Sequence, residues 1–393
     1  MSILSILWKG TPRMRIKLNQ NLEQLEISGI RLFNSQTTAY DDVIKLTIGE
    51  PTFATPEPIK DALKASLDKN RTFYPSFAGS DTLKKGIIAY EKRINQVDYA
   101  MDEILITQGA TGAIFAALGS ILNPEDEVIL FQPTYVAYQP AVEFYHGKPV
   151  FVDTTPNQFQ LDYEAIKKAI TPKTKAMIVN SPNNPTGVIY NEDSLNIIKR
   201  VLDEHDIFVI SDDVYAQLVY DNATFLNQDS DYKDKIILTQ SLSKPYAMTG
   251  WRIGYLCAHK DIIKSAHKVQ QYAAAGIPLF IQDAAEVALN TNVDSMKAFY
   301  KQNRDDVVKL LQKHNVPFVY PQGAFYIFID ISTKGLDSWT FATQLLHAKH
   351  VAVIPGVVFS QHSDHYIRIS LAASNQDCIE GVTRLIHFLQ GQA

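Results

Sequence analysis

The sequence has little cysteine, no long apolar run and no block of charges of one sign. Two cysteines among 393 residues, Cys257 and Cys378, do not make a disulfide framework, which favours a reducing compartment. No window reaches the roughly 18 apolar residues of a membrane-spanning helix. The apolar patch near the N-terminus has no basic region before it, so it does not match a secretory signal. We therefore expect a cytoplasmic protein with no membrane partner.

Charged and metal-binding residues show no special clustering either. Lys and Arg together number 37 and Asp and Glu 42, which gives a net charge of −5. A basic cluster of the kind that binds nucleic acid is missing, so we expect no nucleic-acid partner. The ten histidines are scattered and no CxxC or HExxH spacing occurs, which argues against a metal site.

From about residue 100, short apolar runs rich in β-branched residues alternate with longer helical patterns. Continuous apolar strands separated by helices are typical of a mostly parallel sheet with helices on both faces. We therefore predict an α/β fold with a seven-stranded sheet, its strands at residues 103–107, 127–131, 148–152, 176–180, 207–211, 235–239 and 252–257.

The pattern changes near residue 286. A long helical pattern, interrupted near residues 290–292, leads to short strands with one helix between them, which indicates a smaller α+β domain at 286–393. We place the large domain at 46–285 and expect the segment 1–45 to pack with the small domain. The stretch from Met14 to Phe33 predicts an amphipathic helix, which raises the hypothesis that translation starts at Met14 rather than Met1.

Unusual residues follow the ends of the predicted strands, where ligands bind in open α/β sheets. After the strand at 103–107, Gly109, Ala110 and Thr111 form a tight turn into a helix, whose N-terminus favours an anion such as phosphate. The turn is not GxGxxG with an acidic residue ~20 positions on, which excludes a dinucleotide-binding fingerprint. A plain glycine turn would explain the same residues.

Aromatic, amide and acidic residues follow three further strands. Tyr135 follows the strand at 127–131 and either stacks on a flat ring or packs as an ordinary aromatic residue. The proline-stiffened loop NSPNNPTG either directs Asn183 or Asn184 into the site or forms a simple turn. Asp212 ends an apolar strand and needs a cationic or N–H partner if it is buried. Alternatively, it or Asp213 caps the next helix.

Lys244 follows the strand at 235–239, within the stretch QSLSKPYAMTGWRIGY. A lysine in a partly desolvated site near another cation has a lowered pKa and becomes a usable amine nucleophile. Arg252 and the hydroxyls of Ser241 and Ser243 could hold a dianionic phosphate. A lysine, an acid, an aromatic ring, hydrogen-bond donors and a phosphate cup at one sheet edge together predict a pyridoxal 5'-phosphate site.

The same stretches carry a family resemblance. From about residue 27 to its C-terminus, the sequence resembles the fold-type I, class I/II aminotransferases. It is most similar to the bacterial aspartate/aromatic subgroup, including the aminotransferase A type proteins of Gram-positive bacteria. The matching motifs are LTIGEPTFATP (46–56), YPSFAGSDTLKKGI (74–87), NSPNNPTG (180–187), SDDVY (211–215), SLSKPYAMTGWRIGY (241–255), GAFYIF (323–328) and YIRISLA (366–372).

The resemblance implies transamination between an L-amino acid and a 2-oxo acid, by a ping-pong mechanism through a Schiff base on Lys244. Glutamate and 2-oxoglutarate would be one substrate pair. The other amino acid would be aspartate, an aromatic amino acid or N-acetyl-L,L-diaminopimelate. The resemblance also implies a homodimer with shared active sites.

Residue by residue, the resemblance gives each matched position a role. Asp212 would pair with the ring nitrogen, Tyr135 would stack on the ring, and Asn184 and Tyr215 would bond the phenolic oxygen. The phosphate would be held by Gly109, Ala110, Thr111, Ser241, Ser243 and Arg252, and by Tyr74 of the partner subunit. The substrate would contact Gly49, Asn184 and Arg368, with Arg368 clamping the α-carboxylate.

Three positions depart from the family pattern. Pro245 directly follows Lys244, Asp213 stands where Glu is commoner, and Ser360 stands where glycine is usual. None removes a functional group, so we expect effects on rate or specificity more than on reaction class.

Two other functions compete with transamination. A carbon–sulfur β-lyase on the same scaffold shares the proton abstraction, but it would release pyruvate and ammonia from cystathionine without a 2-oxo acid acceptor. A non-enzymatic sensor fused to a DNA-binding module is disfavoured, because the 45 residues before LTIGEP leave no room for a winged helix.

Overall fold

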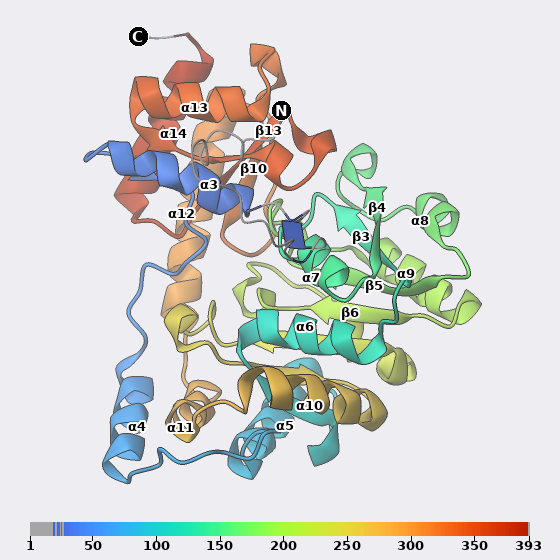
Figure 1. Cartoon of the computed structure of the whole chain (residues 1–393). Helices are drawn as coiled ribbons and strands as arrows, with labels where there is room; N and C mark the ends of the chain where they lie inside the picture. Colours follow the sequence, from blue (N-terminus) through green and yellow to red (C-terminus); the bar gives the residue numbers. More distant parts are fainter. Residues whose placement is uncertain (1–18, 20–21, 24, 26, 392–393) are drawn as a thin grey trace.

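The structure is a computed structural model that describes residues 19, 22–23, 25 and 27–391 (Figure 1). The helix expected over 14–33 lies largely outside the described residues, as does the question of a start at Met14. Within them, α3 (Gly29–Gln36) covers the end of that stretch. Both cysteines are free and buried.

A seven-stranded sheet forms the centre of the molecule, which confirms the predicted α/β fold. Its strands are β2 (Ile104–Thr107), β3 (Glu127–Gln132), β4 (Lys148–Asp153), β5 (Thr174–Asn180), β6 (Phe208–Asp212), β7 (Ile236–Ser241) and β8 (Gly254–Cys257). They lie in the order β2-β8-β7-β6-β5-β3-β4, and only β8 runs against its neighbours. β8 begins two residues later than predicted, because Arg252 has a φ of +55°, which extended strands do not adopt.

Helices cover both faces of this sheet, as Figure 1 shows. One face packs against α6 (Gly109–Ile121), α7 (Tyr138–Phe144) and α10 (Lys260–Ala274). The other face packs against α8 (Tyr163–Ala169) and α9 (Glu192–Glu204) at one end, and at the other against α5 (Asp81–Asn95), α11 (Leu279–Ala288) and the neighbouring α4 (Glu57–Asp68). Alternate residues of a strand point to opposite faces, so Ile210 of β6 joins the α6 face and Val209 joins the α9 face.

The C-terminal part contains a second, antiparallel sheet. Its order is β12-β13-β10-β9, formed by β9 (Phe318–Val319), β10 (Tyr326–Asp330), β12 (Ile354–Pro355) and β13 (Tyr366–Ser370). The helices α12 (Asp294–Lys313), α13 (Ser338–Lys349) and α14 (Asn375–Leu389) pack around it. The apolar run at residues 351–355 is divided between the two small sheets, because β11 (Val351–Ala352) pairs with β1 (Ile44–Lys45) whereas β12 pairs with β13.

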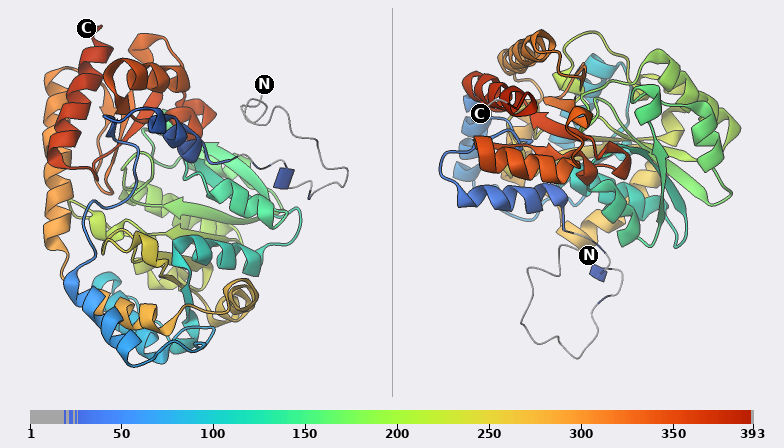
Figure 2. Two further views of the ribbon diagram at one scale, coloured as in Figure 1. Left: turned by 60° about the vertical axis from the view of Figure 1, so that its left-hand side comes forward. Right: turned by 90° about the horizontal axis from the view of Figure 1, so that it is seen from above.

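The described N-terminal residues contact this second sheet rather than the first. Phe33 of α3 is buried in the same hydrophobic cluster as α12 and β10, and its ring meets the edge of Trp339 with centroids 5.7 Å apart. In both views of Figure 2, α3 lies beside the C-terminal helices. We propose that the described residues from 27 to 45 form one domain with the C-terminal part. The predicted limit at residue 285 lies inside α11, so we propose the limit between α11 and α12 instead.

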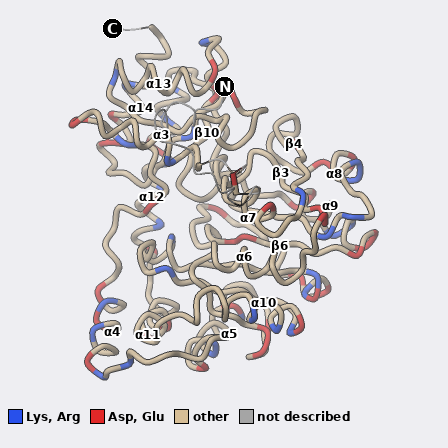
Figure 3. Tube along the Cα trace, viewed as in Figure 1, with Lys and Arg blue, Asp and Glu red and all other residues tan. Residues whose placement is uncertain are grey.

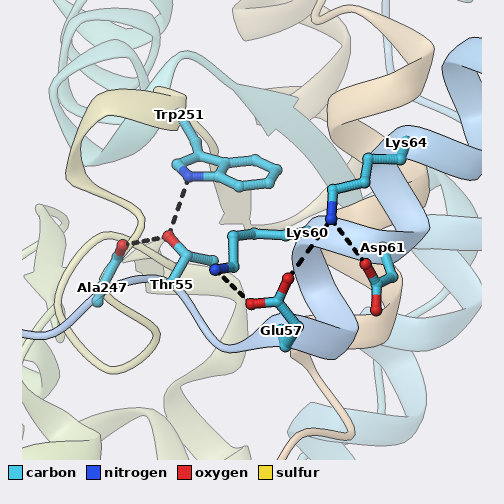
Figure 4. A network of polar contacts seen from close by, with 7 residues as sticks. All are labelled: Thr55, Glu57, Lys60, Asp61, Lys64, Ala247 and Trp251. Atoms are coloured by element: carbon cyan, nitrogen blue, oxygen red, sulfur yellow. Dashed lines mark hydrogen bonds and ion pairs between the residues drawn. The ribbon is translucent and has the colours of Figure 1, made fainter.

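The segment from β1 to α4 crosses from one part to the other and is tied to the loop that follows β7. Thr55 Oγ1 donates to the Ala247 carbonyl at 2.6 Å and accepts from Trp251 Nε1 at 3.1 Å (Figure 4). The first two turns of α4 then carry an ion-pair cluster in which Lys64 bonds Asp61 at 2.9 Å and Glu57 at 3.4 Å. These exposed ion pairs contribute little stability. The Thr55 contacts, together with a hydrogen bond from the Thr249 hydroxyl to Glu50, hold the segment beside the loop.

Charges of both signs are interspersed over the outer helices and loops (Figure 3). No helix among the described residues is long and apolar enough to cross a membrane. The described part of the chain also holds no group of three or more acidic, cysteine or histidine side chains that could bind a metal ion.

Candidate active site

A pocket of about 260 Å³ lies at the carboxyl ends of β5, β6 and β7, with β10 and β13 of the second sheet forming its opposite wall. Most of the residues predicted from sequence line it: Gly49, Ala110, Thr111, Tyr135, Asn184, Asp212, Tyr215, Ser241, Ser243, Lys244, Arg252 and Arg368. Gly109 directly precedes Ala110 in the chain but is not itself one of the lining residues. Tyr74 lies apart from the pocket and is 88% exposed.

Lys244 projects into the pocket from the loop after β7. Its Nζ donates a hydrogen bond to the Gly49 carbonyl at 2.5 Å. Burial lowers the pKa of Lys244 to about 8, Glu50 opposes this shift, and Arg368 and Arg252 add to it. A larger fraction of this amine is therefore unprotonated at neutral pH than for an exposed lysine.

Asp212 occupies the last position of β6 and is buried. Its Oδ2 accepts a hydrogen bond from the Tyr138 hydroxyl at 2.5 Å, while Oδ1 has no hydrogen-bond partner among the described residues. Burial raises the pKa of Asp212 to about 6, and the Tyr138 bond limits that rise. The sequence predicted a cationic or N–H partner, and a hydrogen bond from the Val214 N–H, with one from the Thr239 hydroxyl, also limits the rise in pKa. The first turn of α7 adds the Tyr138 phenol, which the sequence did not indicate.

The N-terminus of α6 and the loop after β7 together form a cradle for an anion. No side chain caps α6, so its first N–H groups are left for another acceptor. A Cβ atom at Gly109 would lie 3.1 Å from Arg252 Nη2, which shows how closely the guanidinium approaches this helix end. Ser241 Oγ donates to Ser243 Oγ at 2.9 Å beside them. A helix N-terminus, an arginine and two hydroxyls suit a phosphate group.

Arg368 reaches the pocket from β13 and is 2% exposed. Its Nη1 donates to Asn184 Oδ1 and its Nη2 to the Thr47 carbonyl, both at 2.9 Å. Its Nε has no hydrogen-bond partner among the described residues, and the guanidinium lies 4.4 Å from the Tyr326 ring centroid. Burial lowers the pKa of Arg368, yet arginine remains charged in proteins. The Arg368 guanidinium is thus a buried cation that is positioned to bind a carboxylate.

The pocket lining also contains residues that were not predicted, among them Tyr138, Tyr326 and Asn180. Tyr138 begins α7 three residues after Tyr135, and the two rings meet edge to face with centroids 5.5 Å apart. Tyr326 shares a 2.9 Å hydrogen bond between hydroxyls with Tyr215. Asn180 ends β5, where its Nδ2 donates to the Asp212 carbonyl and its Oδ1 accepts from the Asn184 N–H, both at 2.9 Å. Asn180 and Tyr326 belong to the quoted motifs NSPNNPTG and GAFYIF, whereas Tyr138 had no such signal.

The residues present fit pyridoxal phosphate. The unpartnered Asp212 Oδ1 suits a protonated ring nitrogen, because a buried acceptor without a donor is costly. The cradle at α6 suits a phosphate, and Lys244 supplies the amine that binds an aldehyde. Arg368 Nε leaves a donor for a second, carboxylate-bearing molecule.

Comparisons with known proteins agree with this site. The chain matches the family described as aminotransferase class I and II over residues 41–385. It is 40% identical over 381 residues to a probable N-acetyl-LL-diaminopimelate aminotransferase of Bacillus subtilis, covering 95% of each chain. It is 36% identical to aromatic-amino-acid aminotransferase 2 of Thermococcus litoralis, covering 94% of this chain and 97% of that protein. The structure of Thermus thermophilus aspartate aminotransferase with maleate has a TM-score of 0.90 at 32% identity, covering 95% of this chain and 100% of that one.

The likeness extends over both sheets and does not depend on one motif. The three relatives are named for different amino acids, yet each is named an aminotransferase. Class I and II aminotransferases use pyridoxal phosphate, which the pocket residues fit. The chain therefore belongs to the class I and II aminotransferases and is a transaminase that works with this cofactor.

Proposed function

We propose that the protein exchanges amino groups between an L-amino acid and a 2-oxo acid by a ping-pong mechanism, with glutamate and 2-oxoglutarate as one pair. Its other substrate would be aspartate, an aromatic amino acid or N-acetyl-L,L-diaminopimelate, since the relatives reported above are named for these three classes. The observation that carries the proposal is the placement of the Lys244 amine, the Asp212 carboxyl and the Arg368 guanidinium in one pocket.

When bound, pyridoxal phosphate supplies a ring that withdraws electrons from the substrate α-carbon. Arg368 would bind the substrate α-carboxylate and so orient the α-hydrogen. Lys244, whose pKa is lowered to about 8, would accept the proton from the α-carbon and return it, because a base near neutrality transfers protons efficiently in both directions. Gly49, whose carbonyl accepts from Lys244, would close the substrate side of the pocket.

The proposed cofactor contacts come from the wall formed by the first sheet. Asp212 would hold a proton on the ring nitrogen, and Tyr135 would lie against the ring. Asn184 and Tyr215 would bond the phenolic oxygen. The phosphate would lie in the cradle formed by Gly109, Ala110, Thr111, Ser241, Ser243 and Arg252. Each contact is supported by pocket lining or by adjacency to it.

Tyr74 does not reach the pocket of its own chain, and its 88% exposure supports a role outside it. Phe73 beside it is 79% exposed, so two adjacent aromatic rings project from the same loop. We propose a homodimer in which Tyr74 of the partner subunit completes the phosphate site. Burial of exposed aromatic rings is a common feature of such interfaces.

The test of this function is Lys244→Ala, compared with Lys64→Ala on the exposed face of α4. We expect Lys244→Ala to lose the visible absorbance of the bound cofactor and nearly all turnover, and Lys64→Ala to keep both. Full turnover without Lys244 would contradict the proposal.

The substrates can be identified by mixing single amino acids with the holoenzyme and recording the loss of cofactor absorbance in one turnover. We expect a donor from one of the three named classes, together with glutamate, to react fastest. Pyruvate and ammonia released from cystathionine, without a 2-oxo acid present, would instead identify the β-lyase.

A further inference from the structure

Two consecutive carboxyl groups lie at the end of β6, and both are buried. Asp212 is 3% exposed and Asp213 is 2% exposed. Because side chains alternate along a strand, they point to opposite faces of the sheet. Asp212 faces the pocket on the side of α7, whereas Asp213 faces α5 on the other side. The two carboxyls therefore have separate surroundings although their backbones adjoin.

The surroundings of Asp212 favour a negative charge. The Tyr138 hydroxyl donates to its Oδ2 at 2.5 Å, and hydrogen bonds to the ionised form stabilise it. The pocket that it lines also contains the cations Lys244, Arg252 and Arg368. Its second oxygen, Oδ1, has no partner among the described residues and is left for a donor in the pocket.

The surroundings of Asp213 favour a neutral acid. The hydrogen bond from Ser211 Oγ to Oδ1, at 2.7 Å, lowers the pKa of Asp213, but burial outweighs it, and Oδ2 has no hydrogen-bond partner among the described residues. The ionisable groups that face it are Asp212, Glu91 of α5 and the Tyr99 phenol, none of which is a cation. Glu91 is itself fully buried and accepts hydrogen bonds from Tyr255 and Asn95.

We propose that Asp212 and Asp213 form a carboxyl pair carrying a single negative charge, which Tyr138 places on Asp212 while Asp213 stays protonated. Asp213 is then a positioning residue: its neutrality removes a like charge that would otherwise oppose ionisation of Asp212. The inference rests on the proposed role of Asp212 toward the cofactor. The inference also assigns a function to Asp213, the position at which the sequence departs from the family pattern.

The direction of the two pKa values agrees with this arrangement. Burial raises the pKa of Asp213 to about 8, with Asp212 and Glu91 adding to the rise, whereas the pKa of Asp212 reaches only about 6. Near neutral pH the first group therefore keeps its proton and the second is largely ionised.

The proton can be observed directly by infrared spectroscopy on protein labelled with ¹³C-aspartate, recorded without added cofactor at pH 7. We expect the carbonyl band of a protonated carboxyl in the wild type and in Asp212→Asn, and its loss in Asp213→Asn. A wild-type spectrum without this band overturns the proposal, whether or not the variants fold. Because the labelled band reports only the protonation of aspartate side chains, the result is independent of the proposed function, which fails separately if the wild type does not bind pyridoxal phosphate.

Cofactor binding tests the division of roles. We expect Asp213→Asn to bind pyridoxal phosphate within about twofold of the wild type, because the amide is neutral and of the same size. Tyr138→Phe should bind it about ten- to a hundredfold more weakly, because a buried bond to a charged group is lost. Tyr190→Phe, which removes a buried hydroxyl outside the pocket, should bind normally. Wild-type affinity in Tyr138→Phe, or a loss in Asp213→Asn as large as in Asp212→Asn, would overturn the assignment.

Stability gives a second readout of Asp213. The folded protein keeps a proton there between about pH 4 and pH 8 that the unfolded chain releases, so this group makes the folded state less stable as pH rises through that window. Relative to Asp213→Asn, the unfolding equilibrium constant of the wild type should rise by up to about tenfold per pH unit from pH 5 to pH 8. Parallel pH profiles of the two proteins would contradict the proposal.

Discussion

The surroundings of a residue decide its chemistry in this protein, as two lysines show. Lys64 is exposed on α4, where its hydrogen bond to Asp61 raises its pKa and stabilises the ammonium. Lys244 is desolvated beside two arginines, which lowers its pKa to about 8. The same side chain is thus a surface cation at one position and a usable base at the other.

Arg368→Lys should raise the KM for both amino acid and 2-oxo acid, lowering kcat/KM roughly ten- to a hundredfold. Lysine keeps the charge but cannot form the bidentate contact of a guanidinium with a carboxylate. Steady-state kinetics with several donor concentrations measures this effect. Arg384→Lys on α14 is the matched control, since Arg384 bonds Glu380 and the Lys349 carbonyl and does not line the pocket. Equal kinetics for the two variants would show that Arg368 does not bind the substrate.

At the scale of single elements, the site depends on where strands end and helices begin. β5, β6 and β7 end side by side in a parallel arrangement, so Asn180, Asp212 and Ser241 reach the same edge of the sheet. The start of α6 lies at that edge too, because Gly254 of β8 packs against the backbone at Gly109 and Ala110. A close backbone approach of this kind leaves no space for a side chain at Gly254.

Gly109→Ala should weaken pyridoxal phosphate binding by roughly tenfold and lower the free energy of unfolding by about 1–2 kcal/mol. The added methyl group would lie 3.1 Å from Arg252 Nη2, in a residue with a φ of +68°. Cofactor titration and urea unfolding measure the two effects. Gly335→Ala separates the causes, because Gly335 has a φ of +63° but nothing within 4 Å of an added Cβ. The control should lose stability and bind the cofactor normally; unchanged binding in Gly109→Ala would contradict the proposed cradle.

The whole molecule contributes through the joining of its two sheets around the pocket. Arg368 of the second sheet contacts Asn184 beside the first, and Ser360 Oγ donates to Gln132 Oε1 of β3 at 3.2 Å. The departure to serine at position 360 therefore provides a hydrogen bond between the two parts. Nothing in the structure explains the proline at position 245.

Hybrid dimers test whether the active sites are shared between subunits. Mixing Lys244→Ala chains with Tyr74→Ala chains should restore activity that neither variant has alone. Each mixed dimer then holds one site with Lys244 from one chain and Tyr74 from the other. We expect about half of the wild-type activity per mixed dimer, measured after subunit exchange. Activity equal to the average of the separate variants would show that Tyr74 does not act across the interface.

The sequence by itself predicted the seven strands and most of the pocket residues. An apolar strand can be recognised from its own residues, and polar residues that directly follow it can be recognised in the same way. Lys244 and Asp212 were found from this pattern, and ligands gather at that edge of a parallel sheet. The family motifs then supplied Arg368, whose place in the pocket no local pattern would have indicated.

Only the tertiary structure decided which groups meet across the chain. Tyr138 lies 74 positions from Asp212, and its hydroxyl reaches that carboxylate only because α7 packs over the end of β6. The different charge states proposed for Asp212 and Asp213 also depend on packing, since the two residues are adjacent in sequence and face opposite sides of the sheet. A charge state is set by burial and by partners brought from other elements, and the local sequence contains neither.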